Sequence, residues 1–370
     1  MKIGIITIHK IHNYGSVLQA YALQRVCEQL GYEAEIIDYN FPNAFQQGNK
    51  YSDTSDSQPN EPLWIKALFG PALLHQHRGI EQFVNTYINL SSEQYSSPDE
   101  LLFNAPAYDV YLTGSDQVWN PRYSNGDPSF LLHFAPTGAR RVSYAASIGS
   151  DKIPEELLPL YRELLFKYSY LSVREPSGKS IIKKLTGQES QVVLDPTLLL
   201  NRDDWNLIAS KKRIIKNKYI LCYYLNYSFN AFPYVDNLAA DIQNKTGYEI
   251  VRVARPPHHL FIHNTKYCIG ASPEQFLALV RDAEMILTTS FHGTAFAVNY
   301  GKPVFTVVKS RDSSDSRQIN LMKSLSLEDK VLSISDPFPG CEPFYDVENE
   351  QNRLSILRRA SLNFLSNALP

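Results

Sequence analysis

The stretch "IGIITIHKIHNYGSVLQAYALQRVCEQLGYEAEIIDY", residues 3–39, decides the fold. Residues 3–8 form a short apolar, β-branched run that is typical of a buried parallel strand. After a polar turn, residues 16–30 carry apolar side chains near helical spacing, and Gly31 stands where helices commonly stop. Residues 33–39 form a second apolar strand. This order predicts a right-handed βαβ unit and a parallel sheet.

The same alternation continues along the chain and restarts in its second half. Strands are expected at 108–113, 141–146, 171–174, 191–194, 219–225, 248–253, 285–290 and 303–308. Ser272 precedes Pro273, and Gln275 follows three residues after Ser272, which is the pattern of a capping box. The pattern predicts an α/β protein with two Rossmann-like, doubly wound domains that face a cleft. We expect the domains at 1–205 and 206–345, with a C-terminal helix at 346–370 that packs back across the junction.

Composition narrows the class of protein. The chain has 370 residues, of which 44% are hydrophobic and 20% charged, as in ordinary globular proteins. A formal net charge of -2 gives no bulk electrostatic attraction to nucleic acid or to an anionic membrane. The start of the chain lacks the pattern of a signal peptide and no apolar run is long enough to span a membrane, so we expect a cytoplasmic protein. The widely separated Cys27, Cys222, Cys268 and Cys341 are expected to be free thiols.

Polar, small-residue turns follow several of the expected strands. Ligands of doubly wound sheets bind at this carboxyl edge. In the turn after the first strand, Gly15 allows a ligand to approach the backbone, and Ser16 is a candidate cap for the following helix. His9 and His12 are candidates for substrate contact or plain turn residues. The turn is not a G-x-G-x-x-G fingerprint, so dinucleotide binding is not indicated.

The segment "TGSDQVWNP", residues 113–121, combines a hydroxyl, a carboxylate, an amide and an indole. Sugar-binding sites use such mixtures, because a sugar presents both hydroxyls and an apolar face. The alternative is a hydrogen-bonded turn over a buried Trp119. Both interpretations remain open from the residues alone.

Two further strand ends carry charged residues. Arg174 is either paired with Glu175 or another carboxylate, or aimed at an anionic ligand. Asp195, before Pro196, is expected to make a turn or a hydrogen bond between domains. The histidines of "RPPHHLFIHN", residues 255–264, have no recognised metal spacing, so no metal site is predicted.

The strongest single motif is "TTSFHGTAFAVNYGKPVF", residues 288–305. It predicts the end of a strand, a short helix that opens at Gly293 or Thr294, and a second strand. The N-terminus of such a helix favours a phosphate or carboxylate. His292 could donate a hydrogen bond to that anion or act as a general acid. The alternative is a histidine that only caps its own helix.

Taken together, these segments resemble the polysaccharide pyruvyl transferase family. The matching stretches, in order, are "NYGSVLQAYALQ", "LTGSDQVWNP", "SYAASIG", "SVREPSG", "VVLDPTLL" and "SFHGTAFAVNYGKPV". The resemblance implies a GT-B-like pair of domains and transfer of pyruvate from phosphoenolpyruvate onto two hydroxyls of a sugar. The products would be a cyclic ketal and phosphate, with phosphoenolpyruvate as co-substrate and no separate cofactor.

The resemblance also implies roles for residues. Arg174 and His292 would be catalytic, with Arg174 holding the donor and His292 serving as acid or phosphate partner. The N-terminal domain would hold the acceptor. The expected acceptor-binding residues are His9, Asn13, Tyr14, Gly15, Ser115, Asp116, Gln117 and Trp119. The expected donor-binding residues are Ser290, Gly293, Thr294, Arg255 and Lys309. The acceptor would be a sugar of a polysaccharide precursor, with a lipid-linked oligosaccharide at the inner face of the cell membrane among the forms left open.

One departure from the family pattern concerns the donor. Many relatives have Arg-Leu-His where this chain has Ser290, Phe291 and His292, so a donor-binding arginine is missing from its expected place. Arg255, Lys309 or Arg311 could substitute for it. Two other functions fit the same architecture: a glycosyltransferase that uses a nucleotide-sugar, and a non-catalytic protein that binds a glycan or an anion.

Overall fold

The computed structural model describes residues 1–41, 63–225, 229–253, 265–312, 317–339 and 344–370, with the side chains of 63–66 left out. The chain divides into two compact units. Unit 1 comprises Met1–Ser57, Val84–Leu199 and Leu357–Pro370, and unit 2 comprises Gln58–Phe83 and Leu200–Ile356. The N-terminal domain expected at 1–205 therefore overlaps mainly with unit 1, while residues 58–83 group with unit 2.

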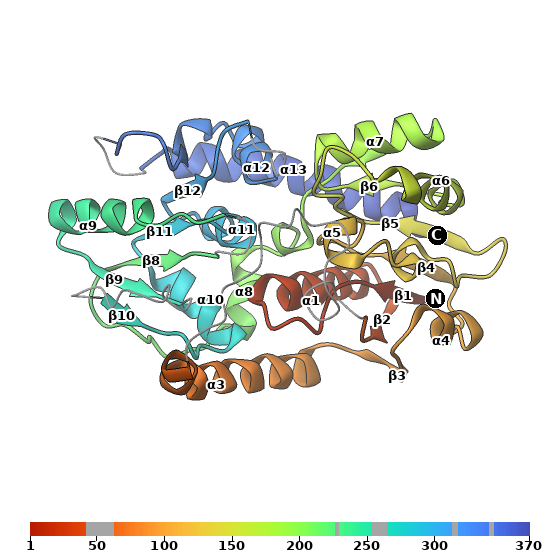
Figure 1. The fold of residues 1–370 in the computed structure, drawn as a ribbon, viewed down its shortest axis with the longest axis horizontal. Helices are drawn as coiled ribbons and strands as arrows, with labels where there is room; N and C mark the ends of the chain where they lie inside the picture. Colours follow the sequence, from red (N-terminus) through yellow and green to blue (C-terminus); the bar gives the residue numbers. More distant parts are fainter. Residues whose placement is uncertain (42–62, 226–228, 254–264, 313–316, 340–343) are drawn as a thin grey trace. The chain divides into compact units, whose positions relative to one another are not determined.

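Unit 1 contains a five-stranded parallel sheet in the order β3-β2-β1-β4-β5 (Figure 1). Its strands are β1 Lys2–Ile6, β2 Glu33–Tyr39, β3 Leu90–Tyr95, β4 Val110–Thr113 and β5 Arg140–Ser143. A separate two-stranded parallel sheet is formed by β6 Ser172–Val173 and β7 Gln191–Val192. Isolated bridges from Val142 to Tyr170 and from Ala146 to Val173 continue the pairing from the β5 edge. This strand order confirms the doubly wound topology expected from residues 3–39.

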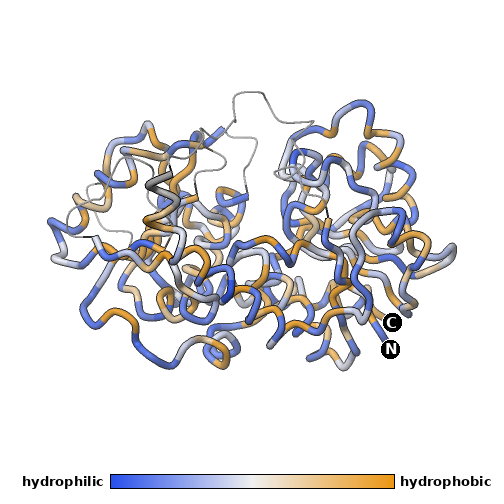
Figure 2. The backbone as a smooth tube through the Cα atoms, turned by 60° about the horizontal axis from the view of Figure 1, so that its bottom comes forward, coloured by the Kyte–Doolittle hydropathy of each residue, from blue (hydrophilic) through white to orange (hydrophobic). Residues whose placement is uncertain are grey.

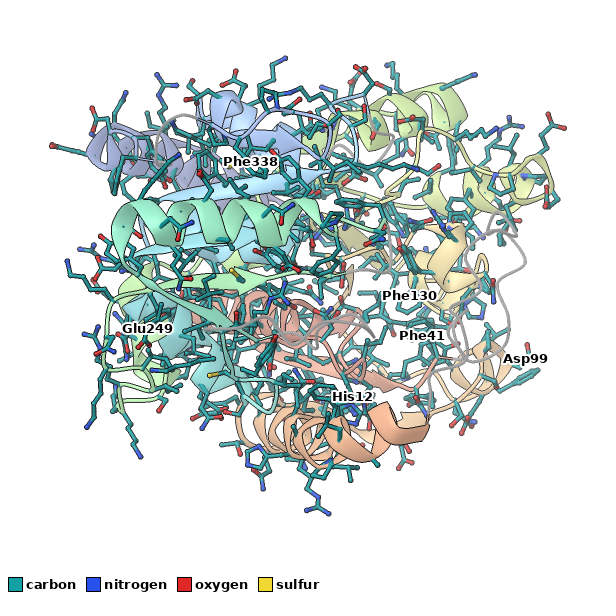
Figure 3. The ribbon with its side chains drawn as sticks, turned by 60° about the vertical axis from the view of Figure 1, so that its left-hand side comes forward. His12, Phe41, Asp99, Phe130, Glu249 and Phe338 are labelled. Carbon is teal, nitrogen blue, oxygen red and sulfur yellow. The ribbon has the colours of Figure 1, made fainter. Side chains whose placement is uncertain are left out.

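The helices of unit 1 follow its strands in the expected alternation. They are α1 Tyr14–Gln29, α4 Pro98–Phe103, α5 Pro121–Ser124, α6 Leu158–Leu165 and α7 Pro176–Thr186, with short 3-10 turns η1 Pro128–Leu131, η2 Glu155–Leu157 and η3 Pro196–Leu198. Aromatic side chains fill part of the core. Phe41 and Phe130, labelled in Figure 3, pack edge to face with ring centroids 5.0 Å apart.

Unit 2 contains a six-stranded parallel sheet in the order β10-β9-β8-β11-β12-β13. Its strands are β8 Tyr219–Tyr223, β9 Glu249–Arg252, β10 Thr265–Tyr267, β11 Met285–Thr288, β12 Val304–Val308 and β13 Val331–Ser333. This is the six-strand order of a Rossmann fold. The core lies between the sheet and its helices, where Ile220, Leu238 and Leu287 are buried. Two Rossmann-like α/β units are therefore confirmed.

The helices of unit 2 are α8 Arg202–Ile208, α9 Tyr234–Thr246, α10 Pro273–Asp282, α11 Phe291–Asn299 and α12 Arg317–Ser324, with the turn η4 Glu328–Lys330. The capping box predicted at Ser272 and Gln275 is present at the start of α10. Helices α3 Leu63–Tyr87 and α13 Val347–Ala368 contribute residues to both units. Figure 2 shows hydrophobic and hydrophilic residues alternating along the helices, as expected for helices with one buried side.

No helix among the described residues is both long enough and apolar enough to span a membrane. The three described cysteines, Cys27, Cys222 and Cys268, are free thiols, as predicted. Cys341 lies outside the described residues.

Candidate functional site

Each of the two larger sheets has one point where the strand order reverses. In unit 1 the point falls between β1 and β4, and in unit 2 between β8 and β11. Doubly wound proteins bind ligands beyond the carboxyl ends of such strands. The turns that follow these four strands contain most of the residues singled out from the sequence.

The turn after β1 leads directly into α1. Asn13, not Ser16, caps the helix, and its side-chain oxygen accepts a hydrogen bond from the Gly15 N–H at 2.8 Å. The prediction of Ser16 as the cap is wrong because the helix begins two residues earlier, at Tyr14, which is buried. Ser16 instead lies in the first turn of α1, and its hydroxyl donates to Asp116 Oδ2 at 3.0 Å.

His9 is fully enclosed beside the end of β2. Its Nδ1 lies 3.1 Å from the Thr7 carbonyl oxygen and its Nε2 lies 3.3 Å from Asp38 Oδ1. Burial acts to raise the pKa of Asp38, but hydrogen bonds and charges from His9 and Lys10 outweigh burial and hold that pKa below its ordinary value. Both ring nitrogens of His9 therefore face acceptor oxygens of the protein.

The turn after β4 is held by its own side chains. Ser115 Oγ lies 2.9 Å from Asp195 Oδ2 and 3.0 Å from the Ala145 carbonyl oxygen. The Gln117 side-chain oxygen accepts a hydrogen bond from Asn120 Nδ2 at 2.7 Å. Ser115, Asp116 and Gln117 lie at the carboxyl end of β4, as the sequence predicted. The side chains of Ser115 and Gln117 make hydrogen bonds within the protein.

Trp119 belongs to the core of unit 1. Its side chain is 0% exposed, its indole N–H donates to the Phe130 carbonyl at 2.9 Å, and Tyr168 packs edge to face against it. This geometry matches the second interpretation of the segment, a hydrogen-bonded turn over a buried Trp119. A contact between its ring and a sugar would require the core to open.

Asp116 has a strained backbone. Its φ is 71°, in the left-handed region, and Ala145 after the neighbouring strand has a φ of 51°. Such a conformation costs a non-glycine residue about 1–2 kcal/mol, and Asp tolerates it better than most because of its short polar side chain. A bridge between Asp116 and Ala146 helps to fix the backbone. Non-glycine strain of this kind is enriched at functional sites.

Arg174 lies directly after β6 and is buried. Its Nη1 donates to Asp195 Oδ2 at 2.8 Å, and its Nη2 lies 3.6 Å from Asp116 Oδ1. Asp195 caps the η3 turn by accepting from the Thr197 N–H at 3.0 Å, which confirms the turn expected there. The sequence named Glu175 as the first candidate partner of Arg174, and the structure adds these two carboxylates from other strand ends.

Glu175 is buried and makes a separate cluster. Its Oε1 accepts hydrogen bonds from the Ser147 hydroxyl and from the N–H groups of Ile148 and Gly149, at 2.8–3.1 Å. These contacts tie the end of β5 to the start of α7. The sequence named this glutamate only as a candidate partner of Arg174, because only the fold brings residues 147–149 to it.

In unit 2, α11 begins at Phe291, so the opening predicted at Gly293 or Thr294 is wrong by two or three residues. Ser290 is the N-cap, and its hydroxyl accepts from the Gly293 N–H at 3.3 Å. A serine cap two residues after the strand leaves no room for a longer turn. His292 consequently lies in the first turn of the helix, 7% exposed, with its ring edge-on to Phe291.

Gly293 and Thr294 connect the helix to the sheet. A Cβ on Gly293 would overlap Thr288 Oγ1 and approach the Tyr223 ring to 3.0 Å, so the helix can pack this closely only with glycine. The Thr294 hydroxyl donates to the Ser290 carbonyl at 3.1 Å and lies 2.8 Å from Thr306 Oγ1. Gly293 and Thr294 therefore fix the start of α11 against the sheet. This helix start is the predicted anion-binding position.

Two of the three predicted substitutes for the missing arginine belong to the part of the chain that the structure describes. Arg255 lies outside the described residues. Lys309 is exposed at the end of β12. Arg311 donates to the Val331 carbonyl at 2.6 Å and pairs with Asp336 at 3.1 Å.

Arg317 was missed by the sequence analysis. It opens α12, is 8% exposed, and its guanidinium carbon lies 5.9 Å from the centre of the Phe291 ring. The next residue, Gln318, donates to the Thr289 carbonyl at 3.0 Å and so anchors α12 to the turn before α11. Nothing in the local sequence around 317 marks it, because its position depends on the helix after β12.

The described residues contain no group of three or more His, Cys, Asp or Glu side chains placed to hold a metal ion. His258, His259 and His263 lie outside that part of the chain.

Comparisons with known proteins identify one family. A family model described as polysaccharide pyruvyl transferase matches residues 13–310. A search of curated proteins finds no match.

The similar solved structures are distant. UDP-GlcNAc 2-epimerase from Methanocaldococcus jannaschii has 15% identity and a TM-score of 0.48, with 96% of this chain and 99% of that chain covered. A putative UDP-N-acetylglucosamine 2-epimerase from Listeria monocytogenes has 11% identity and a TM-score of 0.49, with 99% and 90% covered. A glycosyltransferase from Streptomyces sp. SF2575 has 14% identity and a TM-score of 0.45, with 97% and 96% covered. Identities this low leave the chemistry of this chain to its own residues.

Proposed function

Because the chain belongs to the polysaccharide pyruvyl transferase family, we propose that it transfers pyruvate from phosphoenolpyruvate onto two hydroxyls of a sugar acceptor, forming a cyclic ketal and releasing phosphate. One observation supports this beyond the family match. The six segments that carry the resemblance fall at the carboxyl ends of β1, β4, β5, β6, β7 and β11 or on the helices that follow. Segments far apart in sequence thus share the edges where doubly wound sheets bind ligands.

The donor is assigned to unit 2. Phosphoenolpyruvate carries a phosphate and a carboxylate, and the start of α11 offers the positive end of a helix. His292 in the first turn is the proposed acid that protonates the methylene carbon of the donor, which creates a cationic centre at the neighbouring carbon. Arg317, over Phe291, adds a cation beside the same helix start and is a stronger candidate for the second donor group than Arg255, Lys309 or Arg311.

The acceptor is assigned to unit 1. Asn13, Gly15 and Asp116 lie at the point where the strand order reverses. Tyr14 and His9 are buried beside them, and Ser115 and Gln117 hold the turn. Arg174 positions Asp116 and Asp195 in this proposal, rather than holding the donor itself.

Ketal formation is acid–base chemistry without net oxidation, so the proposal includes phosphoenolpyruvate as co-substrate and no separate cofactor. The acceptor is a sugar of a polysaccharide precursor. Free, nucleotide-linked and lipid-linked forms of this sugar are distinguished by measuring which of them gains the mass of pyruvate in the reaction.

The test is turnover with defined donors. The chain is incubated with candidate sugar acceptors and either phosphoenolpyruvate or nucleotide-sugars, and phosphate release and acceptor mass are measured. Pyruvyl transfer predicts phosphate release and a mass gain only with phosphoenolpyruvate. Transfer from a nucleotide-sugar would establish a glycosyltransferase, and binding without turnover would establish a binding protein.

His292→Ala tests the catalytic assignment. We expect kcat to fall by about 10²–10⁴-fold, the usual contribution of a general acid, with the circular dichroism spectrum unchanged. His133→Ala is the control, since His133 is half-buried in unit 1 and contacts the Pro98 carbonyl. An unfolded His292→Ala protein would show that this histidine only supports its helix, and wild-type activity would remove it from the mechanism.

We also propose that the chain acts in the cytoplasm and can associate with the inner face of the membrane through α3. Between residues 67 and 78 of this helix the exposed residues are Ala67, Leu68, Pro71, Leu74, His75 and Arg78, whose spacing places them along one side. Residues 62–80 contain no Asp or Glu. Apolar side chains together with basic residues are typical of helices that lie on anionic membranes.

Vesicle sedimentation tests this association. We expect binding to vesicles that contain phosphatidylglycerol and weaker binding to pure phosphatidylcholine. The double variant Leu68→Glu, Leu74→Glu should lose it, whereas Leu207→Glu, at a 74% exposed position on α8, should keep it. Equal binding by both variants would exclude α3 as the contact.

A further inference from the structure

Five buried acidic or histidine side chains lie at the carboxyl edge of the unit 1 sheet, and they differ in what a ligand can reach. The side chains of His9 and Asp195 are 0% exposed, and Glu175 is 1% exposed. Asp38 and Asp116 each have side chains that are 12% exposed. A group that exchanges a proton with a bound acceptor must touch it, which leaves these last two carboxylates.

Both carboxylate oxygens of Asp38 already contact other side chains of the protein. Its Oδ1 contacts both His9 and Lys10, and its Oδ2 accepts from Gln94 at 3.3 Å. It also lies within β2, which is one strand away from the reversal point between β1 and β4. Its charge therefore serves the contacts that hold His9 and Lys10.

Asp116 has spare capacity. Its Oδ2 accepts from the Ser16 hydroxyl at 3.0 Å, and its Oδ1 accepts from the Gln117 N–H at 2.9 Å. An ionised carboxylate can accept about four hydrogen bonds. Asp116 thus retains room for the hydroxyl of a ligand, and it lies at the reversal point itself.

Two neighbours surround the carboxylate of Asp116. Ser16, in the first turn of α1, donates a hydrogen bond to the Asp116 carboxylate, which therefore lies near the positive end of the helix. Arg174 lies 3.6 Å away and pairs more closely with Asp195 at 2.8 Å. Two carboxylates and one guanidinium leave one negative charge uncompensated within this trio, on the carboxylate that is partly exposed.

The backbone conformation of Asp116 restricts the directions in which its carboxylate can point. With a φ of 71° and a bridge to Ala146, Asp116 has little freedom to turn away, and the Ser147 N–H donates to its carbonyl at 3.0 Å. A residue held in an uncommon conformation by its surroundings is a common feature of catalytic groups.

We propose that Asp116 is the general base that removes the proton from the attacking hydroxyl of the acceptor, with Ser16 and Arg174 as positioning residues. This inference rests on the proposed function. As the hydroxyl oxygen bonds to the cationic carbon derived from phosphoenolpyruvate, its proton moves to Asp116. The second hydroxyl attacks in the same way after the bond between that carbon and the phosphate oxygen breaks, and phosphate leaves with the electron pair. Over one cycle the two hydroxyl protons are balanced by one on the new methyl group and one on phosphate, so Asp116 returns to its ionised form.

The test uses two substitutions that suit the left-handed backbone. Asp116→Asn keeps the size and tolerates a positive φ, and Asp116→Gly removes the side chain without strain. We expect kcat of Asp116→Asn to fall by about 10²–10⁴-fold, with the dissociation constant for phosphoenolpyruvate unchanged. Added formate, a small carboxylate, should restore part of the kcat of Asp116→Gly. The control Asp38→Asn removes an equally exposed carboxylate from the same edge and should lose less than tenfold.

The pH profile separates a base from a structural residue. Wild-type kcat should rise with pH as the base ionises, and this rise should be absent in Asp116→Asn. Asp116→Asn with kcat within tenfold of wild type, or Asp116→Gly that formate does not rescue, overturns the role of Asp116 alone. A wild-type chain that releases no phosphate from phosphoenolpyruvate with any acceptor overturns the proposed function, and this role falls with it.

Discussion

The two units have the same strand order around their reversal points but stabilise those points with different chemistry. In unit 1 the strand ends are tied by a buried guanidinium and carboxylates, chiefly Arg174, Asp195 and Asp116. In unit 2 the ends of β8 and β11 are tied by threonine hydroxyls, where Thr288 donates to the Tyr223 carbonyl at 2.7 Å and Thr289 to the Leu225 carbonyl at 3.1 Å.

This difference suits the two substrates of the proposed reaction. An edge with an excess carboxylate can accept hydrogen bonds from sugar hydroxyls and repels a phosphate. The start of α11, with His292 in its first turn and Arg317 beside Phe291, favours an anion. In the proposed function, one topology thus provides two sites of opposite preference through the residues at its strand ends.

The largest expected effect comes from removing the charge that holds the unit 1 edge. Arg174→Ala leaves Asp195 and Asp116 without their shared guanidinium in a buried position. Breaking a buried pair by removing one partner typically costs about 3–5 kcal/mol. We therefore expect unit 1 to lose most of its stability, rather than the selective loss of donor use that the resemblance suggested.

The measurement must resolve the units, because a chain with two units need not unfold in one step. Hydrogen exchange followed by mass spectrometry should show faster exchange in peptides from β4, β5 and β6, with little change in β8 and β11. Arg174→Lys is the control that keeps the charge. Normal exchange in Arg174→Ala, together with weak binding of phosphoenolpyruvate, would return Arg174 to the donor site.

Local sequence patterns predicted the regular elements well and the polar contacts poorly. The capping box at Ser272 and the helix stop at Gly31 depend only on neighbouring residues, and both are present. Strands β3, β10 and β13 were missed because they are short or partly polar, without the apolar run of a central strand.

The site illustrates the same limit. The sequence placed Arg174 and Asp116 at strand ends, but their pairing joins residues 58 positions apart and depends on the order of strands. The positive φ of Asp116 and the approach of Arg317 to Phe291 have no local signal either. Contacts between separate turns follow from topology, which a single segment does not contain.

A smaller effect is expected from crowding the unit 2 edge. Gly293→Ala places a methyl group against Thr288 Oγ1 and the Tyr223 ring, so α11 must move away from the sheet. Overpacking of this kind costs about 1–3 kcal/mol. Thermal unfolding should shift downward, and the affinity for phosphoenolpyruvate should fall because the helix start moves. Thr288→Ser with Gly293→Ala should not recover stability, since the hydroxyl remains, whereas Thr288→Ala should recover part of it.

The smallest expected effect distinguishes the two edges by their response to acid. Because the pKa of Asp38 is lowered in the folded state, its ionised form stabilises folding at pH values above the unfolded pKa of about 3.9. That contribution is lost as the pH falls from there through the lowered pKa. Wild type should therefore exceed Asp38→Asn in stability at neutral pH, and the gap should close in acid. Thr288→Val, which removes a neutral hydroxyl from the unit 2 edge, should show a gap that does not depend on pH over this range. Hydrogen exchange of β2 and β11 peptides at several pH values measures both gaps, and a constant Asp38→Asn gap would show that the charges of His9 and Lys10 do not hold this part of unit 1.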